Sequence, residues 1–455
     1  MSLLRRLKKK LNPDIKDKDN KELVKNSASA FVLKIAGLGF NYIFTFLIAR
    51  IYGATGSGIY SLFQTVLQFF VNLGKFGFDT AIMRFTAQYK TQGQLSQLKD
   101  LYVKTLKFTV ASSLVFSLVL FFGADKIGEW VFHKPQLGSY FKIAAFAVLP
   151  LVLLGIHADC LRGYKKVAAF AFLNNVSTLI ISSIILAISW FVYKESHLPV
   201  LAYSIGIFIT SVMSIFWWLK ESNIQKIKIT DTVLFNEKFA VAFTLFSASI
   251  LQMVRGWADT IIIGRYLTEA DVGVYKVAFR VATITSLTLT SILISVAPKI
   301  AELYSKNDLK KMAALTQNST KIIFWTSVPV LILFLILPKF IMGLYGPEFE
   351  AGSSVLVFLT LGQFVNAATG PVSNVLNMTG KQKINRNVVL FSTIITISLN
   401  VFFIPVYGIQ AAAIINAIGY VLFNIIPMFI VKYYYGFFTF DVRHVFSFRK
   451  KDILK

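Results

Sequence analysis

Long apolar segments determine what this chain can fold into. A stretch of about 20 apolar residues can cross the hydrocarbon core of a bilayer as a helix, which satisfies its own backbone there. Hydrophobic residues make up 55% of the 455 residues and charged residues only 15%, too apolar a composition for a soluble core. The chain is therefore predicted to be an all-α polytopic membrane protein. We count twelve segments, with approximate limits 28–49, 59–78, 105–123, 141–161, 168–192, 198–219, 239–264, 272–297, 320–343, 352–376, 387–405 and 409–431. The segment boundaries at Pro298, Pro338 and Pro405 are expected to be helix ends.

The positions of the Lys and Arg residues predict how these segments are oriented. The basic residues that give the net charge of +25 are spread over the loops between the apolar segments. This distribution argues against a nucleic-acid partner, which would need them in one patch. Both termini and the even-numbered loops hold most of the 47 Lys and Arg residues, and cytoplasmic loops are the ones that carry such an excess. Both termini are therefore predicted to be cytoplasmic in the cell membrane. No apolar stretch follows the N-terminal basic residues as a cleavable signal would require.

An internal repeat divides the chain into two halves. The sequence LIARIYGATGSGIY (47–60) ends the first segment, and IIGRYLTEADVGVY (262–275) ends the seventh. A duplicated membrane unit places a functional site between two lobes, which is the usual architecture of a secondary transporter. Six segments in each half predict two pseudosymmetric six-helix lobes that enter the membrane in the same direction. The predicted domains are a cytoplasmic N-terminal segment (1–27), an N-lobe (28–219), a cytoplasmic linker (220–238), a C-lobe (239–431) and a cytoplasmic tail (432–455).

Two stretches resemble a known family. Residues 49–64 (ARIYGATGSGIYSLFQ) and residues 374–414, which include TGK at 379–381 and IPVYGIQAAA at 404–413, are similar to polysaccharide exporters of the multidrug/oligosaccharidyl-lipid/polysaccharide (MOP) superfamily. The resemblance extends from Asn26 to Tyr435. It implies a flippase that moves an oligosaccharide, linked to a polyprenyl (pyro)phosphate, from the cytoplasmic to the outer leaflet by alternating access for surface polysaccharide synthesis. The implied partners are this substrate and membrane lipids, with no cofactor. Lipid II flippases of the superfamily usually have fourteen helices. The twelve helices predicted here therefore argue against a role in peptidoglycan synthesis.

Ionisable side chains at membrane depth are the candidate functional residues. Each costs roughly 2.5–3.5 kcal/mol there unless it is paired or lines water. Opposite charges one helical turn apart can pair, whereas Lys276 and Arg280 repel each other and require an anion. Together with Arg255 they would suit a phosphate or pyrophosphate headgroup. In the alternative structural interpretation, Arg255 pairs with Asp259 while Lys276 extends to the outer interface. The set consists of Lys34, Lys75, Asp79, Arg255, Asp259, Lys276 and Arg280.

Further candidates have other roles. Lys34 is expected either to bind the headgroup in the inward-open state or to pair with Asp79. Asp79 and Asp259 are the candidate ion-coupling carboxylates, for a proton or sodium, although structural ion pairs are the alternative. Amides that would contact sugar hydroxyls, or bridge helices instead, are Gln64 and Gln68 in the second segment and Asn366, Asn374 and Asn377 in the tenth. Structural roles are expected for His157 and Asp159 at a helix end, for Arg50 and Arg265 as caps of helix carbonyls, and for Cys160 as a buried apolar side chain.

Two other functions compete with the flippase. A cation-coupled multidrug antiporter of the same superfamily generally needs carboxylates within the membrane to bind its cations. Here the seven ionisable candidates at membrane depth are five basic and two acidic residues, which would repel a cation. A polytopic glycosyltransferase or polymerase needs a catalytic acidic motif on an outer loop. The longest outer loop (123–140) has Asp125 and Glu129 as its only acidic residues, with no paired acidic motif beside them. No P-loop is present for an ATP-driven pump. The chain is therefore predicted not to be an enzyme, and no metal site is expected.

Overall fold

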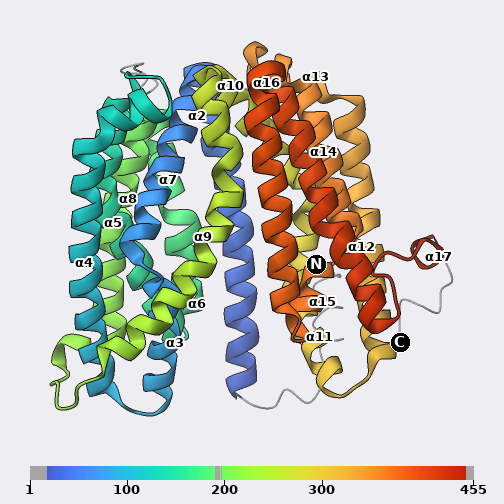
Figure 1. The fold of residues 1–455 in the computed structure, drawn as a ribbon. Helices are drawn as coiled ribbons and strands as arrows, with labels where there is room; N and C mark the ends of the chain where they lie inside the picture. Colours follow the sequence, from blue (N-terminus) through green and yellow to red (C-terminus); the bar gives the residue numbers. More distant parts are fainter. Residues whose placement is uncertain (1–17, 190–194, 196, 447–455) are drawn as a thin grey trace. The chain divides into compact units, whose positions relative to one another are not determined.

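The computed structural model describes residues 18–189, 195 and 197–446, and its regular elements are helices (Figure 1). Ten helices in this part of the chain are long and apolar enough to cross a membrane. The predicted all-α polytopic membrane fold is thereby confirmed. The longer helices are α2 (Lys18–Lys75), α3 (Phe78–Thr91), α4 (Leu95–Lys126), α5 (Leu137–Gly163), α7 (Thr178–Ser189), α8 (Leu198–Ser222), α9 (Phe235–Tyr266), α10 (Glu269–Ala282), α11 (Leu287–Ser305), α12 (Leu309–Ile336), α14 (Ser353–Ala368) and α16 (Gln382–Tyr435). The shorter ones are α6 (Val167–Phe172), α13 (Pro338–Gly343), α15 (Val372–Met378) and α17 (Val442–Val445). Short π-helical segments lie at Ile127–Val131 and Leu173–Ser177, and short 3₁₀ segments at Ile224–Lys226, Thr283–Ser286 and Pro347–Gly352.

Two of the membrane helices are interrupted at a glycine. Gly53 in α2 has φ 66° and ψ −165°, and Gly408 in α16 has φ 65° and ψ −153°. Residues with a Cβ rarely adopt such a conformation, so glycine supplies the break. Gly53 separates the predicted segments 28–49 and 59–78, and Gly408 separates 387–405 and 409–431. Each of the twelve predicted segments overlaps one of the ten candidate spans in the described part of the chain, while twelve helices in two six-helix lobes remain a prediction.

Prolines mark the helix ends less well than glycines do. Pro338 begins α13 directly after α12, as expected. Pro298 lies inside α11, so the helix end expected there is wrong. Pro405 also lies inside α16, but the break expected near it is present three residues later, at Gly408. A proline removes one backbone hydrogen bond, which neighbouring groups in a membrane helix can compensate. The change of direction after Pro405 comes instead from the positive φ of Gly408.

Contacts divide the chain into two compact units. Unit 1 contains residues 1–47, 66–128 and 135–250, and unit 2 contains residues 48–65, 129–134 and 251–455. In unit 1, α5 is the central helix and packs against α3, α4 and α8. In unit 2, α14 has that position and packs against α10, α12 and α16. Unit 2 therefore includes two short segments from the first half of the sequence as well as most of the second half.

The linker predicted at 220–238 packs along the beginning of α4 within unit 1. The Lys99 ammonium donates to the carbonyl oxygens of Gln225 and Ile227. The Asp100 carboxylate accepts from the backbone N–H of Val233 at 2.7 Å and from Lys104 at 2.8 Å. These contacts hold the polar linker against one helix.

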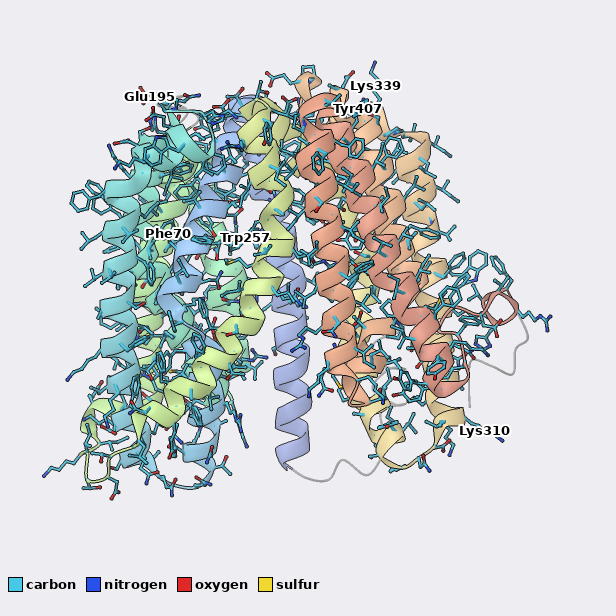
Figure 2. The ribbon with its side chains drawn as sticks, in the orientation of Figure 1. Phe70, Glu195, Trp257, Lys310, Lys339 and Tyr407 are labelled. Carbon is cyan, nitrogen blue, oxygen red and sulfur yellow. The ribbon has the colours of Figure 1, made fainter. Side chains whose placement is uncertain are left out.

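Unit 2 presents two opposite ends. Lys339 and Tyr407 lie at one end, and Lys310 lies at the other (Figure 2). The charge distribution of the sequence assigns Lys310 to a cytoplasmic loop and the neighbourhood of Lys339 and Tyr407 to the outer side. The positions of these three residues in the unit agree with that assignment.

Candidate functional site

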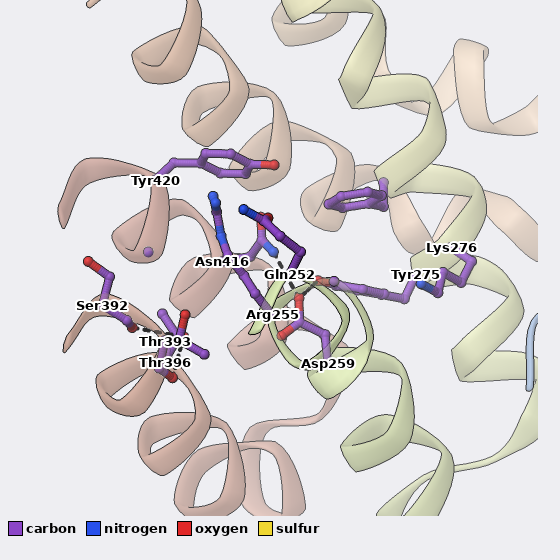
Figure 3. A pocket seen from close by; sticks show the side chains of 13 residues that line it. Gln252, Arg255, Asp259, Tyr275, Lys276, Ser392, Thr393, Thr396, Asn416 and Tyr420 are labelled. Atoms are coloured by element: carbon purple, nitrogen blue, oxygen red, sulfur yellow. Dashed lines mark hydrogen bonds between the residues drawn. The ribbon is translucent and has the colours of Figure 1, made fainter. Parts of the chain in front are cut away.

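A polar cavity of about 280 Å³ lies inside unit 2, between α9, α10 and α16 (Figure 3). All three helices are candidate membrane spans, so the polar side chains around it lie where an unpaired charge is costly. The cavity is lined by Gln252, Arg255, Gly256, Asp259, Tyr275, Lys276, Phe279, Ser392, Thr393, Thr396, Asn416, Gly419 and Tyr420. Three of the residues proposed from the sequence are among them: Arg255, Asp259 and Lys276.

The Asp259 carboxylate is held by three neutral donors. Its Oδ2 accepts hydrogen bonds of 2.8 Å from the Tyr275 hydroxyl and from Asn416 Nδ2, and its Oδ1 accepts one of 2.8 Å from Asn400 Nδ2. Hydrogen bonds to a carboxylate stabilise its charged form without a neighbouring cation. The hydrogen bonds to Asp259 thus come from partners other than Arg255, one helical turn away.

Arg255 packs on an aromatic ring instead of on Asp259. Its Cζ lies 3.8 Å from the ring centroid of Phe423 and 5.9 Å from that of Tyr420. A guanidinium over an aromatic face is attracted by the ring quadrupole, while the N–H groups at its edge stay available for hydrogen bonds. The structural alternative, in which Arg255 pairs with Asp259, is not the arrangement found.

Lys276 provides the second cation of the cavity. It lies on α10 next to Tyr275, and its Nζ is 5.8 Å from the ring centroid of Phe279. The charged groups that act on it are Asp259, which attracts it, and Arg280, which repels it. Arg255 and Lys276 therefore line one cavity together with a single carboxylate.

A buried chain of hydrogen bonds fixes one wall of the cavity. The Ser286 hydroxyl donates to Gln363 Oε1 at 2.9 Å, and Gln363 Nε2 donates to the Tyr420 hydroxyl at 2.9 Å. Gln363 is only 2% exposed, so its amide has few conformations available. The chain connects α14 to α16 and holds Tyr420 beside Arg255.

Hydroxyl groups form another wall, on the first half of α16. Ser392 and Thr393 donate to the carbonyl oxygens of Val388 and Val389 at 2.8 and 2.7 Å. Thr396 donates to the Ser392 carbonyl oxygen at 3.0 Å. Each hydroxyl oxygen keeps lone pairs that can accept hydrogen bonds from a bound molecule.

The sequence analysis missed most of the neutral residues of this site. Polar residues recur every fourth position along α16, at 392, 396 and 400 and again at 416 and 420. Residues at that spacing share one helix face. A polar stripe along an otherwise apolar helix was the signal that could have identified these side chains.

The other proposed binding residues do not line this cavity. Arg280 lies one turn beyond Lys276 on α10, and Asn374 lies on α15. Lys34 is exposed on the part of α2 that belongs to unit 1. Gln64 and Gln68 are partly buried on the second half of α2. The roles proposed for these five residues stay predictions.

Asp79 lies beside Lys75, one of the two partners considered for it. Its carboxylate lies 3.8 Å from Lys75 Nζ in unit 1. A Cβ built at Gly155 would lie 2.6 Å from that ammonium, so the glycine makes room for Lys75 against α5. Asp159, one turn further along α5, acts electrostatically on this pair and lies 3.9 Å from Arg162. Asp79 thus pairs with Lys75, one helical turn away, rather than with Lys34.

Three predicted structural residues have structural contacts. Arg265 donates to the carbonyl oxygens of Trp130 and Val131 at 2.8 and 2.9 Å, as a carbonyl cap should. His157 Nε2 is hydrogen-bonded to the Tyr102 hydroxyl at 3.0 Å. Cys160 is fully buried. The described residues contain no group of three or more His, Cys, Asp or Glu that could hold a metal ion.

Comparison with known proteins identifies relatives of this chain. The model of the family described as "Polysaccharide biosynthesis protein" matches residues 23–304, and the MatE model matches residues 245–402. The probable low-salt glycan biosynthesis flippase Agl15 of Haloferax volcanii is 26% identical over 415 residues, which are 88% of this chain and 81% of Agl15. The probable flippase AglR of the same organism is 30% identical over 184 residues, 40% of this chain and 38% of AglR.

Solved structures share the fold. An inward-facing multidrug resistance MATE family transporter of the MOP superfamily has a TM-score of 0.69 at 13% identity, over 87% of this chain and 94% of that one. The lipid II flippase MurJ in an inward closed conformation has a TM-score of 0.66 at 18% identity, over 90% and 87%. Since the family model covers more than half of the sequence, the chain belongs to the polysaccharide biosynthesis protein family.

Proposed function

We propose that this membrane protein is a flippase that moves a lipid-linked oligosaccharide from the cytoplasmic to the outer leaflet for surface polysaccharide synthesis. Family membership and the flippase relatives Agl15 and AglR support this function. The substrate would carry its sugar on a polyprenyl phosphate or pyrophosphate. Transport would proceed by alternating access, without a chemical step.

One observation carries the proposal: Arg255 is stacked on Phe423 while the nearby carboxylate is occupied by neutral donors. Within the described part of the chain, no ion pair shorter than 4.0 Å joins Arg255 to a carboxylate. Two N–H groups of a guanidinium can donate hydrogen bonds to two oxygens of one phosphate at the same time. Lys276 adds a second positive charge to the same cavity.

The cavity distinguishes anions from cations by its charge. Arg255 and Lys276 outnumber Asp259, so the cavity should repel a cationic drug and attract an anionic headgroup. The hydroxyls of Ser392, Thr393 and Thr396 would accept hydrogen bonds from the first sugar. Headgroup contacts at other steps are proposed for Lys34 and Arg280, and further sugar contacts for Gln64, Gln68 and Asn374.

Asp79 and Asp259 are the proposed sites of ion coupling. They carry the carboxylates of the two charge clusters described above, one in each unit. If a proton or sodium gradient drives transport through either residue, Asp79→Asn or Asp259→Asn should make flipping independent of that gradient. Unchanged gradient dependence in both variants would contradict coupling at these residues.

The proposed arrangement in the membrane follows from the charge distribution. Both termini and the linker would lie in the cytoplasm, and the two sequence halves would form six-helix lobes related by an axis along the membrane normal. The repeat and the excess of Lys and Arg in alternate loops support this arrangement.

Binding selectivity tests the proposed function directly. The purified protein in lipid nanodiscs should bind farnesyl pyrophosphate, a short prenyl pyrophosphate, and should not bind ethidium at comparable concentrations. Arg255→Ala should weaken pyrophosphate binding by about tenfold or more, because one charge-assisted hydrogen bond is worth that much. Ethidium binding that is lost in Asp259→Asn would instead support a cation antiporter.

A further inference from the structure

Arg255 and Asp259 are placed as if to form an ion pair, yet each has a different partner. They lie one turn apart on α9, where opposite charges ordinarily interact. The low dielectric of a membrane-buried cavity strengthens that attraction. Nevertheless, Arg255 lies 3.8 Å from the ring centroid of Phe423, and the Asp259 carboxylate accepts its three hydrogen bonds from neutral groups. Two of these donors, Tyr275 and Asn416, are drawn with Asp259 in Figure 3.

The three donors reach Asp259 from separate positions in the fold. Tyr275 lies on α10, Asn400 lies before the Gly408 break of α16, and Asn416 lies after it. Tyr275 is 1% exposed and Asn400 is fully buried, so packing fixes both side chains. A carboxylate that accepts hydrogen bonds from three directions cannot swing toward Arg255 without losing some of them.

We propose that Tyr275, Asn400 and Asn416 are positioning residues that hold Asp259 away from Arg255 and so keep the guanidinium available for the substrate's pyrophosphate. The inference rests on the proposed flippase function and adds to it the residues that determine selectivity for an anion. Neutral donors suit this role because they stabilise the carboxylate without adding a cation that would compete for the headgroup.

Loss of one donor should redirect Asp259 to the nearest cation. A carboxylate oxygen without a partner at membrane depth is unfavourable. Arg255 and Lys276 both interact with Asp259 through space, and either would replace the missing donor. Arg255 would then leave Phe423, and the cavity would lose the group that binds pyrophosphate.

Conservative variants test whether loss of one donor to Asp259 weakens pyrophosphate binding. Tyr275→Phe removes one hydroxyl, and Asn416→Leu replaces an amide with an apolar group of similar size. In nanodiscs each should bind farnesyl pyrophosphate about tenfold more weakly than the wild type, the change expected for one hydrogen bond to a charged group. Asn424→Leu is the matched control, since the Asn424 amide donates only to the Tyr420 carbonyl oxygen of its own helix at 2.9 Å. This control should bind as the wild type does.

A second substitution separates positioning from a structural effect. Asp259→Asn removes the charge that draws Arg255 away, so the double variants Tyr275→Phe/Asp259→Asn and Asn416→Leu/Asp259→Asn should recover wild-type affinity. Asp259→Asn alone should bind at least as tightly as the wild type. Misfolding caused by the first substitution would not be repaired by the second.

Three results would overturn the inference. Tyr275→Phe and Asn416→Leu could both bind pyrophosphate with wild-type affinity, or Asp259→Asn could fail to restore binding in the double variants. Weakening that occurs in sodium buffer but not in potassium buffer would show instead that this cluster holds a cation. A wild-type protein that does not bind farnesyl pyrophosphate would contradict the proposed function itself, before any variant is compared.

Discussion

Gly58 of α2 and Gly273 of α10 pack against each other within unit 2. A Cβ built at Gly58 would overlap the carbonyl oxygen of Glu269 and lie 3.1 Å from the backbone nitrogen of Gly273. A Cβ at Gly273 would overlap the carbonyl oxygen of Ala54 and lie 2.9 Å from the backbone nitrogen of Gly58. Ala54 and Gly58 correspond to Glu269 and Gly273 in the sequence repeat. The repeated motif therefore contacts its own copy reciprocally, as surfaces related by a twofold axis do.

Close packing at this contact predicts that neither glycine tolerates a side chain. Gly58→Ala or Gly273→Ala should destabilise the protein by roughly 1–3 kcal/mol, the usual cost of overpacking. Thermal unfolding in detergent measures the effect. Gly39→Ala on α2 is the control, because a Cβ there meets no atom within 4 Å. Equal melting temperatures for all three variants would contradict the reciprocal contact.

Glu348 is expected to stabilise the break in α2. Its Oε2 accepts a 2.8 Å hydrogen bond from the Ala54 backbone N–H, directly after Gly53, where the second half of the helix begins. A carboxylate at a helix N-terminus contributes about 1 kcal/mol. Glu348→Ala should therefore lower the melting temperature in detergent, whereas Glu348→Gln should keep part of the effect through its hydrogen bond.

Glu350 provides the matched control for Glu348. Its Oε2 lies 3.4 Å from Lys339 Nζ in an exposed ion pair, and exposed pairs contribute less than about 1 kcal/mol. Glu350→Ala should leave the melting temperature nearly unchanged. A loss of stability as large as that of Glu348→Ala would mean that the helix break is not the reason for the effect.

The membrane segments were predictable because their signal is local. The apolar length of each segment depends on neighbouring residues alone, and the distribution of Lys and Arg among the loops then predicts the orientation. The prolines were less reliable, since Pro298 and Pro405 remain within helices while Gly53 and Gly408 supply the breaks. Backbone conformation at a single glycine depends on the turn that the chain must make.

The site was predictable only in its charged members. Charge at membrane depth is conspicuous, so Arg255, Asp259 and Lys276 were identified from the sequence. Their partners were not, because the spacing on α9 favoured an Arg255–Asp259 pair. Asn400 and Asn416 reach Asp259 from far along the chain, and such contacts leave no trace in one sequence beyond the polar stripe on α16.

Cysteine labelling tests the proposed orientation. Thr55 and Gln94 are exposed positions between predicted segments, and Asn223 is an exposed position in the linker. A cysteine at Thr55 should react with a membrane-impermeant maleimide in intact cells. Cysteines at Gln94 and Asn223 should react only after permeabilisation, and the native Cys160 is buried. Labelling at Asn223 in intact cells would reverse the orientation.

Arg280 should contribute to headgroup transfer as a cation one turn from Lys276. Arg280→Ala should reduce glycan export while the protein remains at normal abundance in the membrane. Arg280→Lys should recover part of the export, because a point charge cannot replace a bidentate fork. Lower abundance of Arg280→Ala, with abundance and export both restored by adding Asp259→Ala, would assign Arg280 a structural role through Asp259.

Export by Arg255 variants tests the central claim most directly. In cells that lack the native protein, the wild type and the control Asn424→Leu should restore surface glycan and the exposure of lipid-linked oligosaccharide at the outer leaflet. Arg255→Ala at equal abundance should leave the lipid-linked oligosaccharide in the cytoplasmic leaflet, with Arg255→Lys intermediate. Full export by Arg255→Ala at wild-type abundance would contradict the account, because the cavity would then transport its substrate without the guanidinium that Phe423 supports.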